Sequence, residues 1–250
     1  MEDFSKFSDL TFDKFRSMAT DETLSSNEKI GFPDSYRQGK EHAIFSDILI
    51  KCPLLRSMGK MILEIGPGCG ILPNLLIDLC KNQQHNLILI DSKEMMDHLP
   101  DYRFIEKLPG RYPDDFSSFI SEHYGKIDIL LAYSVIQYIF AESNLWAFLD
   151  KSLALLRDGG TFLIGDIPNI SQRKRFFSSK TGVSYHQNFT GTLEIPDIRY
   201  NVLESGNIDD SVVIALVNRA RNQGFDAWIM PQASNLPMAN RREDILIRKP

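Results

Sequence analysis

The sequence lacks the features that mark disulfide-bonded, zinc-binding and membrane-spanning proteins. Its 250 residues contain three Cys, and Cys52, Cys69 and Cys80 form no CxxC pair. This odd number and spacing favour reduced thiols in a cytosolic protein over a disulfide framework or a zinc site. No apolar run reaches the roughly 18 residues that a membrane helix needs, and the acidic start MEDFSKFSDL does not resemble a signal peptide. We therefore expect a cytoplasmic protein with no membrane partner.

Positive charge is also scarce. The net charge is -5, and the longest run of Lys and Arg is RKR at residues 173–175. Because a nucleic-acid-binding protein needs a basic face, this composition argues against nucleic acid as a partner. The chain is 43% hydrophobic and contains 16 Phe, which suffices for a full core in one large domain or in one domain with an appendage.

The chain divides into two regions that differ in their hydrophobic pattern. Residues 1–57 carry helical patterns over 3–18 and 35–58 and predict a helical N-terminal cap. Residues 58–250 alternate short apolar runs with helical patterns, as parallel strands joined by helical crossovers do. We expect an α/β fold with a doubly wound, mostly parallel sheet. The predicted strands are residues 61–65, 86–91, 102–106, 126–133, 160–166, 226–230 and 244–249.

One segment, residues 167–207, interrupts this alternation after the fifth predicted strand. It mixes aromatic, polar and turn-forming residues, and a connection of this length in a compact domain is usually functional. In a doubly wound sheet it leaves from the carboxyl edge of a strand, where ligands bind. We expect this insert to be a substrate lid. The alternative is a surface excursion without a role.

Three Gly at alternate positions, Gly66, Gly68 and Gly70, lie between a predicted strand and a predicted helix. A phosphate-binding P-loop needs a Lys that this stretch lacks. A dinucleotide-binding loop needs its third Gly at position 71, which is Ile71. A tight turn without a ligand does not need three Gly, since each costs up to about 1 kcal/mol of backbone entropy.

The stretch EIGPGCG at residues 64–70 resembles the E/DxGxGxG motif of the class I S-adenosylmethionine-dependent methyltransferases. Further landmarks between residues 60 and 166 resemble the same family. Asp91 ends the second predicted strand, Asp128 begins the fourth, and LLRDGG is similar to the family's turn before the fifth. The last two predicted strands are similar to its antiparallel closing pair. The resemblance implies a Rossmann-like, seven-stranded fold, methyltransferase activity and S-adenosylmethionine as the cofactor.

The resemblance also implies how the glycine loop and the second strand hold this cofactor. Gly66, Pro67 and Gly68 let the backbone approach its methionine and ribose portions, because a Cβ would take up that space. Glu64 supports the loop. Asp91 binds both ribose hydroxyls, for which a carboxylate has suitable acceptor geometry. Asp91 can also act as a helix N-cap, and the two roles are compatible.

Further cofactor contacts are expected from four other parts of the chain. Ser92 follows the ribose-binding acid, and Tyr133 and Ser134 line the methionine side at the end of the fourth predicted strand. Arg37 can pair with the methionine carboxylate, or it can be a solvated surface Arg. After the third predicted strand the chain reads EKLPG, without the Gly-Asp pair that often binds adenine in this family. Adenine is therefore expected against Leu108 or held by backbone groups.

Two residues are candidates for a general base. Asp166 lies at the end of the fifth predicted strand, and His186 lies in the insert. Methyl transfer is an in-line attack that depends mainly on alignment, with a base helping a hydroxyl nucleophile. Asp166 can instead cap the following turn. We predict no metal site, because no cluster of acids can be assembled from the sequence.

The expected acceptor is a small molecule methylated on oxygen, with a sugar or glycan precursor as one candidate. Cations beside aromatic residues in the insert suit an anionic or sugar-phosphate ligand, although such a run is more commonly a solvated surface. One alternative is an NAD-dependent or nucleotide-sugar-dependent enzyme. Another is a catalytically silent cofactor-binding protein. The oligomeric state is not predicted.

Overall fold

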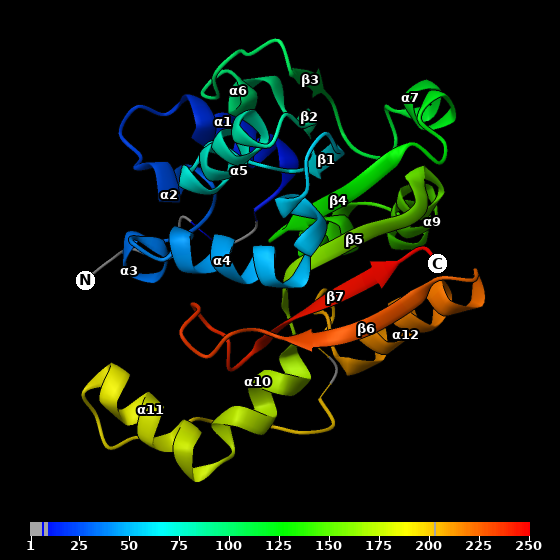
Figure 1. Cartoon of the computed structure of the whole chain (residues 1–250). Coiled ribbons are helices and arrows are strands. Elements are labelled where there is room, and N and C mark those ends of the chain that lie inside the picture. The colour runs from blue at the N-terminus through cyan, green and yellow to red at the C-terminus, as the bar shows by residue number, and fades with distance from the viewer. Residues whose placement is uncertain (1–6, 8–9, 203) are drawn as a thin grey trace.

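A seven-stranded mixed sheet forms the centre of the computed structural model, which describes residues 7, 10–202 and 204–250. The strand order is β3-β2-β1-β4-β5-β7-β6 (Figure 1). Neighbouring strands are parallel except where β7 pairs with β5 and β6. The expected α/β sheet with an antiparallel closing pair is thus confirmed. The strands are β1 (Met61–Ile65), β2 (Asn86–Asp91), β3 (Ile105–Pro109), β4 (Ile127–Tyr133), β5 (Leu156–Pro168), β6 (Asp226–Pro231) and β7 (Arg242–Arg248).

β3 and β5 differ most from the predicted strands. β3 begins at Ile105, later than expected, because residues 102–105 form a turn closed by the Ile105 amide and the Tyr102 carbonyl. β5 begins at Leu156, earlier than expected, so Gly159 and Gly160 lie within the strand. The similarity of LLRDGG to a turn had placed Gly159 before the strand. β4 and β5 shift register near this point, and that irregularity admits the positive φ of 75° at Gly159.

Helices cover both faces of the sheet and give the molecule three layers. One face packs against α7 (Ser117–Glu122), α9 (Leu145–Leu155) and α12 (Asp210–Asn222) around fully buried Phe148 and Phe162. The other face packs against α4 (Glu41–Lys51), the 3-10 helix η2 (Pro53–Arg56) and α5 (Ile71–Asn82). Because β1, β4 and β5 have helices on both sides, their central residues are almost all apolar. Two short helices, α6 (Lys93–Met96) and α8 (Ile136–Glu142), follow β2 and β4.

The N-terminal region contains more breaks than its pattern predicted. The helix expected over 35–58 divides into α3 (Asp34–Arg37), α4 and η2. Gly39, with a positive φ of 75°, separates α3 from α4, and η2 begins at Pro53. Before it lie α1 (Phe12–Thr20) and α2 (Ser26–Lys29), and most of residues 3–9 of the first predicted helix lie outside the described residues. α4 and η2 contribute to the same core as the sheet. The predicted boundary at residue 57 therefore does not coincide with a break in the core.

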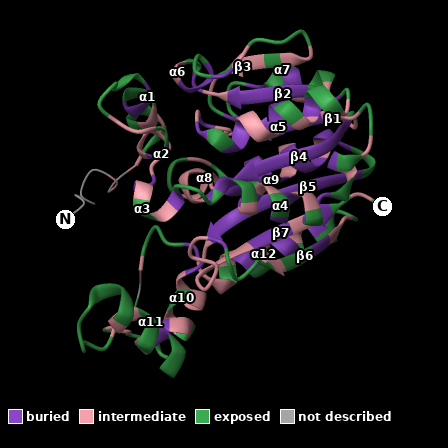
Figure 2. Ribbon diagram, turned by 60° about the vertical axis from the view of Figure 1, so that its left-hand side comes forward, coloured by how far each residue is buried: buried purple, intermediate pink, exposed green. Residues whose placement is uncertain are grey.

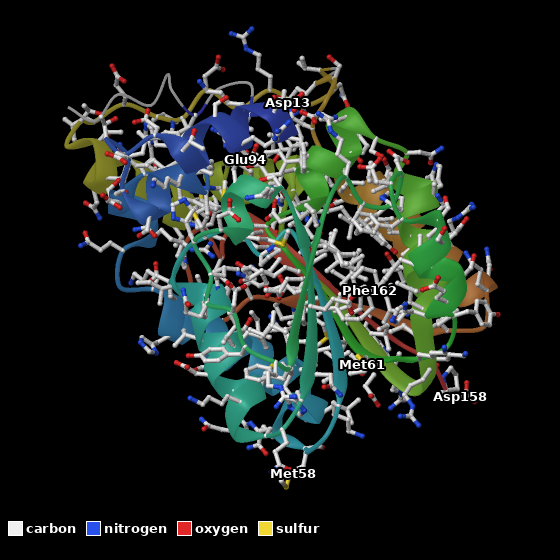
Figure 3. The ribbon with its side chains drawn as sticks, turned by 90° about the horizontal axis from the view of Figure 1, so that it is seen from above. Asp13, Met58, Met61, Glu94, Asp158 and Phe162 are labelled. Carbon is white, nitrogen blue, oxygen red and sulfur yellow. The ribbon has the colours of Figure 1, made fainter. Side chains whose placement is uncertain are left out.

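The first helix lies at the carboxyl end of the sheet. Thr11 caps α1 by accepting from the Lys14 amide, and Arg16 donates to Glu94 of α6 at 2.7 Å. Figure 3 shows Asp13 and Glu94 at one end of the molecule and Asp158 and Met58 at the opposite end. The cap thus lies where β1, β2 and β4 end.

The insert is partly helical. It contains α10 (Ile170–Phe177) and α11 (Lys180–Thr190), which extend away from the sheet; α10 is mostly half-buried and α11 is mostly exposed (Figure 2). Asn169 caps α10 and Ser179 caps α11, each with its side-chain oxygen. Among the described residues, no helix combines the length and the apolar character needed to cross a membrane.

Candidate active site

A cavity lies at the carboxyl end of the sheet, where β1 and β4 are neighbours. It holds about 1130 Å³ of free space, part of it open to solvent. The helices that follow these strands, α5 and α8, pack toward opposite faces of the sheet. Doubly wound sheets bind ligands at such a switch point, because the diverging connections leave a crevice between them.

Eight of the predicted cofactor-binding residues are brought together by the fold at this cavity. They come from the cap, from the glycine loop and from the ends of β2 and β4. These eight are Arg37, Glu64, Gly66, Pro67, Gly68, Asp91, Tyr133 and Ser134.

The glycine loop lines the cavity and also packs closely against side chains of the protein. Gly66 and Gly68 have φ values of 67° and 66°. A Cβ at Gly66 would lie 2.6 Å from Val135 Cγ2, and one at Gly68 would lie 2.7 Å from Ile30 Cγ2. Both the backbone conformation and these close contacts therefore require Gly. The sequence pattern indicated a close approach, but not that the cap supplies one of the contacts.

Asp91 is held in place by two backbone amides. Gly68 N donates to its Oδ2 at 2.9 Å, and Ser92 N donates to its Oδ1 at 2.6 Å. Burial raises the pKa of Asp91 to about 6, against the opposing effect of these two amides. The carboxylate joins the glycine loop to the end of β2 and lines the cavity. This is the arrangement in which a carboxylate can accept from two neighbouring hydroxyls of a ligand.

Glu64 is a buried carboxyl group with an unsatisfied oxygen. It is 4% exposed, and among the described residues its Oε2 has no hydrogen-bond partner. Burial, and to a smaller extent the Asp91 carboxylate, raise the pKa of Glu64 to about 8. Glu64 is therefore mostly protonated at pH 7 in the ligand-free protein. A cation in the cavity would favour its charged form.

The ends of β4 and β5 meet through a short hydrogen bond. Ser134 Oγ donates to Asp166 Oδ2 at 2.5 Å, and both residues have positive φ, 61° and 59°. Arg242 Nη1 also donates to Asp166 Oδ2, at 2.7 Å, and Gln232 Nε2 donates to Oδ1 at 3.3 Å. Such strain in non-Gly residues is frequent at functional sites. Asp166 itself lies behind Ser134 and does not line the cavity.

Gly66→Ala is expected to destabilise the protein by about 1–3 kcal/mol more than Gly125→Ala. Gly125 has nearly the same φ, 66°, but its added Cβ would meet nothing within 4 Å. Gly125→Ala therefore isolates the conformational strain of about 1–2 kcal/mol, whereas Gly66→Ala adds overpacking against Val135. Chemical denaturation of both variants measures the difference. Val135→Ala in the Gly66→Ala background should recover part of it, and equal stability of the two single variants would contradict the contact.

No family model matches the chain, but one curated protein and several solved structures are similar to it. A segment of chondramide synthase from Chondromyces crocatus is 29% identical over 167 residues, covering 62% of this chain and only 4% of that protein. The plantazolicin methyltransferase BpumL, solved with SAH and a triazolic desmethylPZN analogue, superposes with a TM-score of 0.58 at 14% identity, over 95% of this chain and 98% of that one. The CurJ carbon methyltransferase superposes with a TM-score of 0.56 at 16% identity, over 98% and 65% of the two chains.

The chain has the class I methyltransferase fold. Within this methyltransferase fold, two predicted cofactor contacts lie outside the cavity lining. Ser92 is buried, caps α6 by accepting from the Met95 amide, and supports Asp91 through its own amide. Leu108 packs against the hydrophobic core instead of facing the cavity. Gly110 lines the cavity two residues later, where its amide donates to the Asp91 carbonyl at 3.0 Å.

The insert of this methyltransferase fold does not cover the cavity. No described residue between 167 and 207 lines it. His186 lies on α11, where its ring packs edge-on against Phe177 with centroids 6.2 Å apart, away from the cavity lining. The structure therefore brings Asp166, but not His186, next to the candidate site.

The cap supplies the cover that sequence reasoning placed in the insert. Phe12, Phe15, Ile30 and Phe32 line the cavity, and the ring of Phe15 packs edge-on against Tyr138 with centroids 4.9 Å apart. The helical pattern over residues 3–18 predicted a helix with an apolar face. Only the packing of α1 over α6 and α8 shows that this face borders the site.

The described part of the chain contains no cluster of side chains suited to bind a metal ion. Among residues 7, 10–202 and 204–250, no three His, Cys, Asp or Glu side chains are arranged to hold a metal ion. The cluster at the ends of β4 and β5 instead joins carboxylates to cations.

Proposed function

We propose that this protein transfers a methyl group from S-adenosylmethionine to an oxygen atom of a small molecule. The observation that carries the proposal is the Asp91 carboxylate at the end of β2. Two backbone amides hold it, and it faces a cavity whose wall is a glycine loop with positive φ. A vicinal diol such as a ribose matches this fixed acceptor.

The unsatisfied buried groups of the cavity fit the other end of the cofactor. Arg37 is 4% exposed and lies 4.8 Å over the Phe32 ring, and its Nε has no hydrogen-bond partner among the described residues. Glu64 Oε2 is an unsatisfied acceptor of the same cavity. One buried donor and one buried acceptor suit a ligand with an anionic and a cationic group, and the methionine portion has both. The cofactor, when bound, supplies an electrophilic methyl group on its sulfonium.

Ser134 and Asp166 are proposed to handle the proton of a hydroxyl acceptor. Ser134 lines the cavity, and its Oγ donates to Asp166 at 2.5 Å. Ser134 Oγ can thus accept the proton of the acceptor's hydroxyl while it passes its own proton to the Asp166 carboxylate. The pairing with Arg242 keeps Asp166 oriented for this role.

Asp166→Asn should leave binding of S-adenosylhomocysteine unchanged and lower the rate of methyl transfer. A variant that turns over as fast as the unmodified protein would remove Asp166 from the mechanism.

The similar proteins do not identify the methyl acceptor. The similar solved proteins are named for a carbon methyltransferase and a plantazolicin methyltransferase, and the matched curated protein is a chondramide synthase. These names give no common acceptor, so the fold does not select one. Incubation of the protein with labelled S-adenosylmethionine and a panel of sugars, nucleotide sugars and small hydroxylated metabolites tests the proposal. Mass spectrometry of the product locates the methyl group on oxygen, carbon or nitrogen.

Asp91→Ala is expected to weaken binding of S-adenosylhomocysteine at least about tenfold. Loss of the carboxylate leaves the ribose hydroxyls without a partner, which costs about 1–3 kcal/mol. Isothermal titration measures the change. Asp97→Ala, which removes an exposed carboxylate paired with Lys93, is the control and should change nothing. Unchanged affinity in Asp91→Ala would place the ribose elsewhere.

Two rival functions give different results in simple binding and turnover assays. An NAD-dependent or nucleotide-sugar-dependent enzyme would be stabilised by its own nucleotide and not by S-adenosylmethionine in a thermal-shift comparison. Ile71 in place of the third dinucleotide glycine speaks against it. A catalytically silent protein would bind S-adenosylhomocysteine and methylate no member of the panel.

A further inference from the structure

A second cavity lies where the insert leaves the sheet. It holds about 590 Å³ of free space, part of it open to solvent. Its walls are the end of β5, the start of α10, residues 206–208 and the chain that leads into β7. The polar side chains used below, all in its lining, are Gln137, Arg173, Arg241 and Arg242.

Two of the three guanidinium groups in this cavity lack an anionic partner. Arg242 pairs with Asp166 at 2.7 Å. Within the described parts of the chain, neither Arg173 nor Arg241 has a carboxylate within the 4.0 Å of an ion pair. Both guanidinium groups lie over the same Phe177 ring, at 5.3 Å and 5.6 Å from its centroid.

The neighbouring cations of the insert behave differently. Lys174 pairs with Glu204 at 2.6 Å, and Arg175 pairs with Asp210. Neither Lys174 nor Arg175 lines the cavity, whereas Asn169, which does, donates through Nδ2 to Asp210 at 2.8 Å and to Glu243 at 2.6 Å. The cavity therefore keeps the positive charges of Arg173 and Arg241. Their guanidinium groups lie over the buried Phe177 ring, and this contact limits where they can move. Burial lowers the pKa of Arg241, and the nearby Tyr185 and Tyr36 oppose this effect only in part.

The second cavity adjoins the candidate active site. Gln137 lines it and donates through Nε2 to the carbonyl of Ser134, which lines the first cavity. Arg242 lies over the ring of Phe32 at 5.8 Å, and Phe32 also lines the first cavity. In addition, Gln137 Oε1 is buried and has no partner in the described structure. The two cavities are therefore neighbours, with walls joined by these contacts.

We propose that Arg173 and Arg241 bind an anionic group of the methyl acceptor in this second cavity, while the acceptor's nucleophile enters the first. This inference rests on the proposed methyltransferase function and narrows its substrate class to oxyanions. A carboxylate and a phosphate share the chemistry involved, since each can accept from the paired N–H groups of a guanidinium. Gln137 would supply further polar contact near the nucleophile.

The test uses phenyl phosphate and benzoate as probes, titrated by isothermal calorimetry into the full chain saturated with S-adenosylhomocysteine. The variant Arg173→Gln/Arg241→Gln should bind the preferred probe at least about tenfold more weakly than the unmodified protein, because two charge-assisted contacts are lost. The matched control is Arg175→Gln/Arg248→Gln. This control removes the same net charge as the test variant. Arg175 lies on α10 and is already paired with Asp210, and Arg248 lies on β7 and is already paired with Asp226. Its affinity should change less than about twofold.

The outcomes separate this inference from the proposed function. Equal loss in both double variants, or no saturable binding of either probe to the unmodified protein, overturns the anion site. A preference for phenyl phosphate identifies a phosphate ligand, and a preference for benzoate identifies a carboxylate ligand. Where the double variant does not fold, Arg173→Gln alone serves, since Arg173 is exposed. Binding of S-adenosylhomocysteine is measured separately in all variants; its absence overturns the proposed function, whatever the probes do.

Discussion

Lys51→Met is expected to lower the free energy of unfolding by about 3–5 kcal/mol. Lys51 Nζ lies 2.6 Å from both Asp47 Oδ2 and Asp244 Oδ2, and Asp244 is fully buried. Desolvation lowers the pKa of Lys51, but the two carboxylates outweigh it and raise the pKa, so the ammonium stays charged. Its removal leaves two buried carboxylates next to each other with no cation between them.

The expected loss extends beyond one ion pair because Asp244 joins several elements. Its Oδ1 accepts from the Asp166 amide at 2.8 Å and from Gln232 Nε2 at 3.0 Å. Asp244 thus connects α4, the end of β5 and the chain between β6 and β7 beneath the candidate site. Thermal unfolding should show a fall in Tm of about 10 °C for a chain of this size.

Lys93→Met is the matched control for this experiment. Lys93 makes an ion pair with Asp97 at the same distance, 2.6 Å, and with the same i,i+4 spacing as Lys51 and Asp47, but both side chains are exposed. Its loss should cost about 0.5 kcal/mol or less. Lys51→Met/Asp244→Asn should be more stable than Lys51→Met, because it removes one uncompensated charge. If Lys51→Met and Lys93→Met prove equally stable, the buried cluster does not hold these elements together.

Glu64→Gln is expected to stabilise the ligand-free protein at pH 8 by on the order of 4 kcal/mol and to leave its stability nearly unchanged at pH 4.5. The folded-state pKa of Glu64 is raised from 4.5 to about 8. Between these values the folded protein binds a proton that the unfolded chain has released. Stability contributed by Glu64 is therefore present below pH 4.5, falls as the pH rises, and levels off above pH 8. Gln has nearly the same shape and does not titrate, so it removes this dependence.

Denaturation curves of the two proteins at several pH values between 4.5 and 8 measure the effect. Glu94→Gln is a useful contrast, because hydrogen bonding to Arg16 lowers the pKa of Glu94 to about 2. The sign is then reversed: Glu94 contributes stability above its ordinary pKa of 4.5 that is lost as the pH falls toward 2. Glu94→Gln should be less stable than the unmodified protein at neutral pH. A Glu64→Gln variant that tracks the unmodified protein at every pH would show that Glu64 is ionised in the folded state.

The parts of the site that lie within one strand and its following loop are predictable from the sequence. The alternate glycines after β1 and the acid that ends β2 are local patterns, and parallel strands bring their carboxyl ends to one edge. Gly66, Gly68 and Asp91 accordingly meet at the cavity. Tyr133 and Ser134 follow the same rule at the end of β4.

The contributions that come from packing between distant segments are not predictable in this way. Leu108 was expected at the cavity, but the turn after β3 presents Gly110 instead. His186 was a reasonable titratable candidate by residue type, yet α10 and α11 carry it away from the sheet edge (Figure 2). The aromatic cover comes from Phe12, Phe15 and Phe32, whose place over the cavity depends on how short helices separated by turns fold back.

The sequence by itself determined the alternation of strands and helices, the glycine loop and the acid at the end of β2. These follow from hydrophobic periodicity and from backbone conformations that only certain residues adopt. Only the tertiary structure decided that Ile30 and Val135 close on the glycine loop, that Lys51 lies between Asp47 and Asp244, and that Arg173 and Arg241 share one aromatic ring. Such pairings join residues from separate elements, and they depend on how those elements pack in three dimensions, which no local pattern encodes.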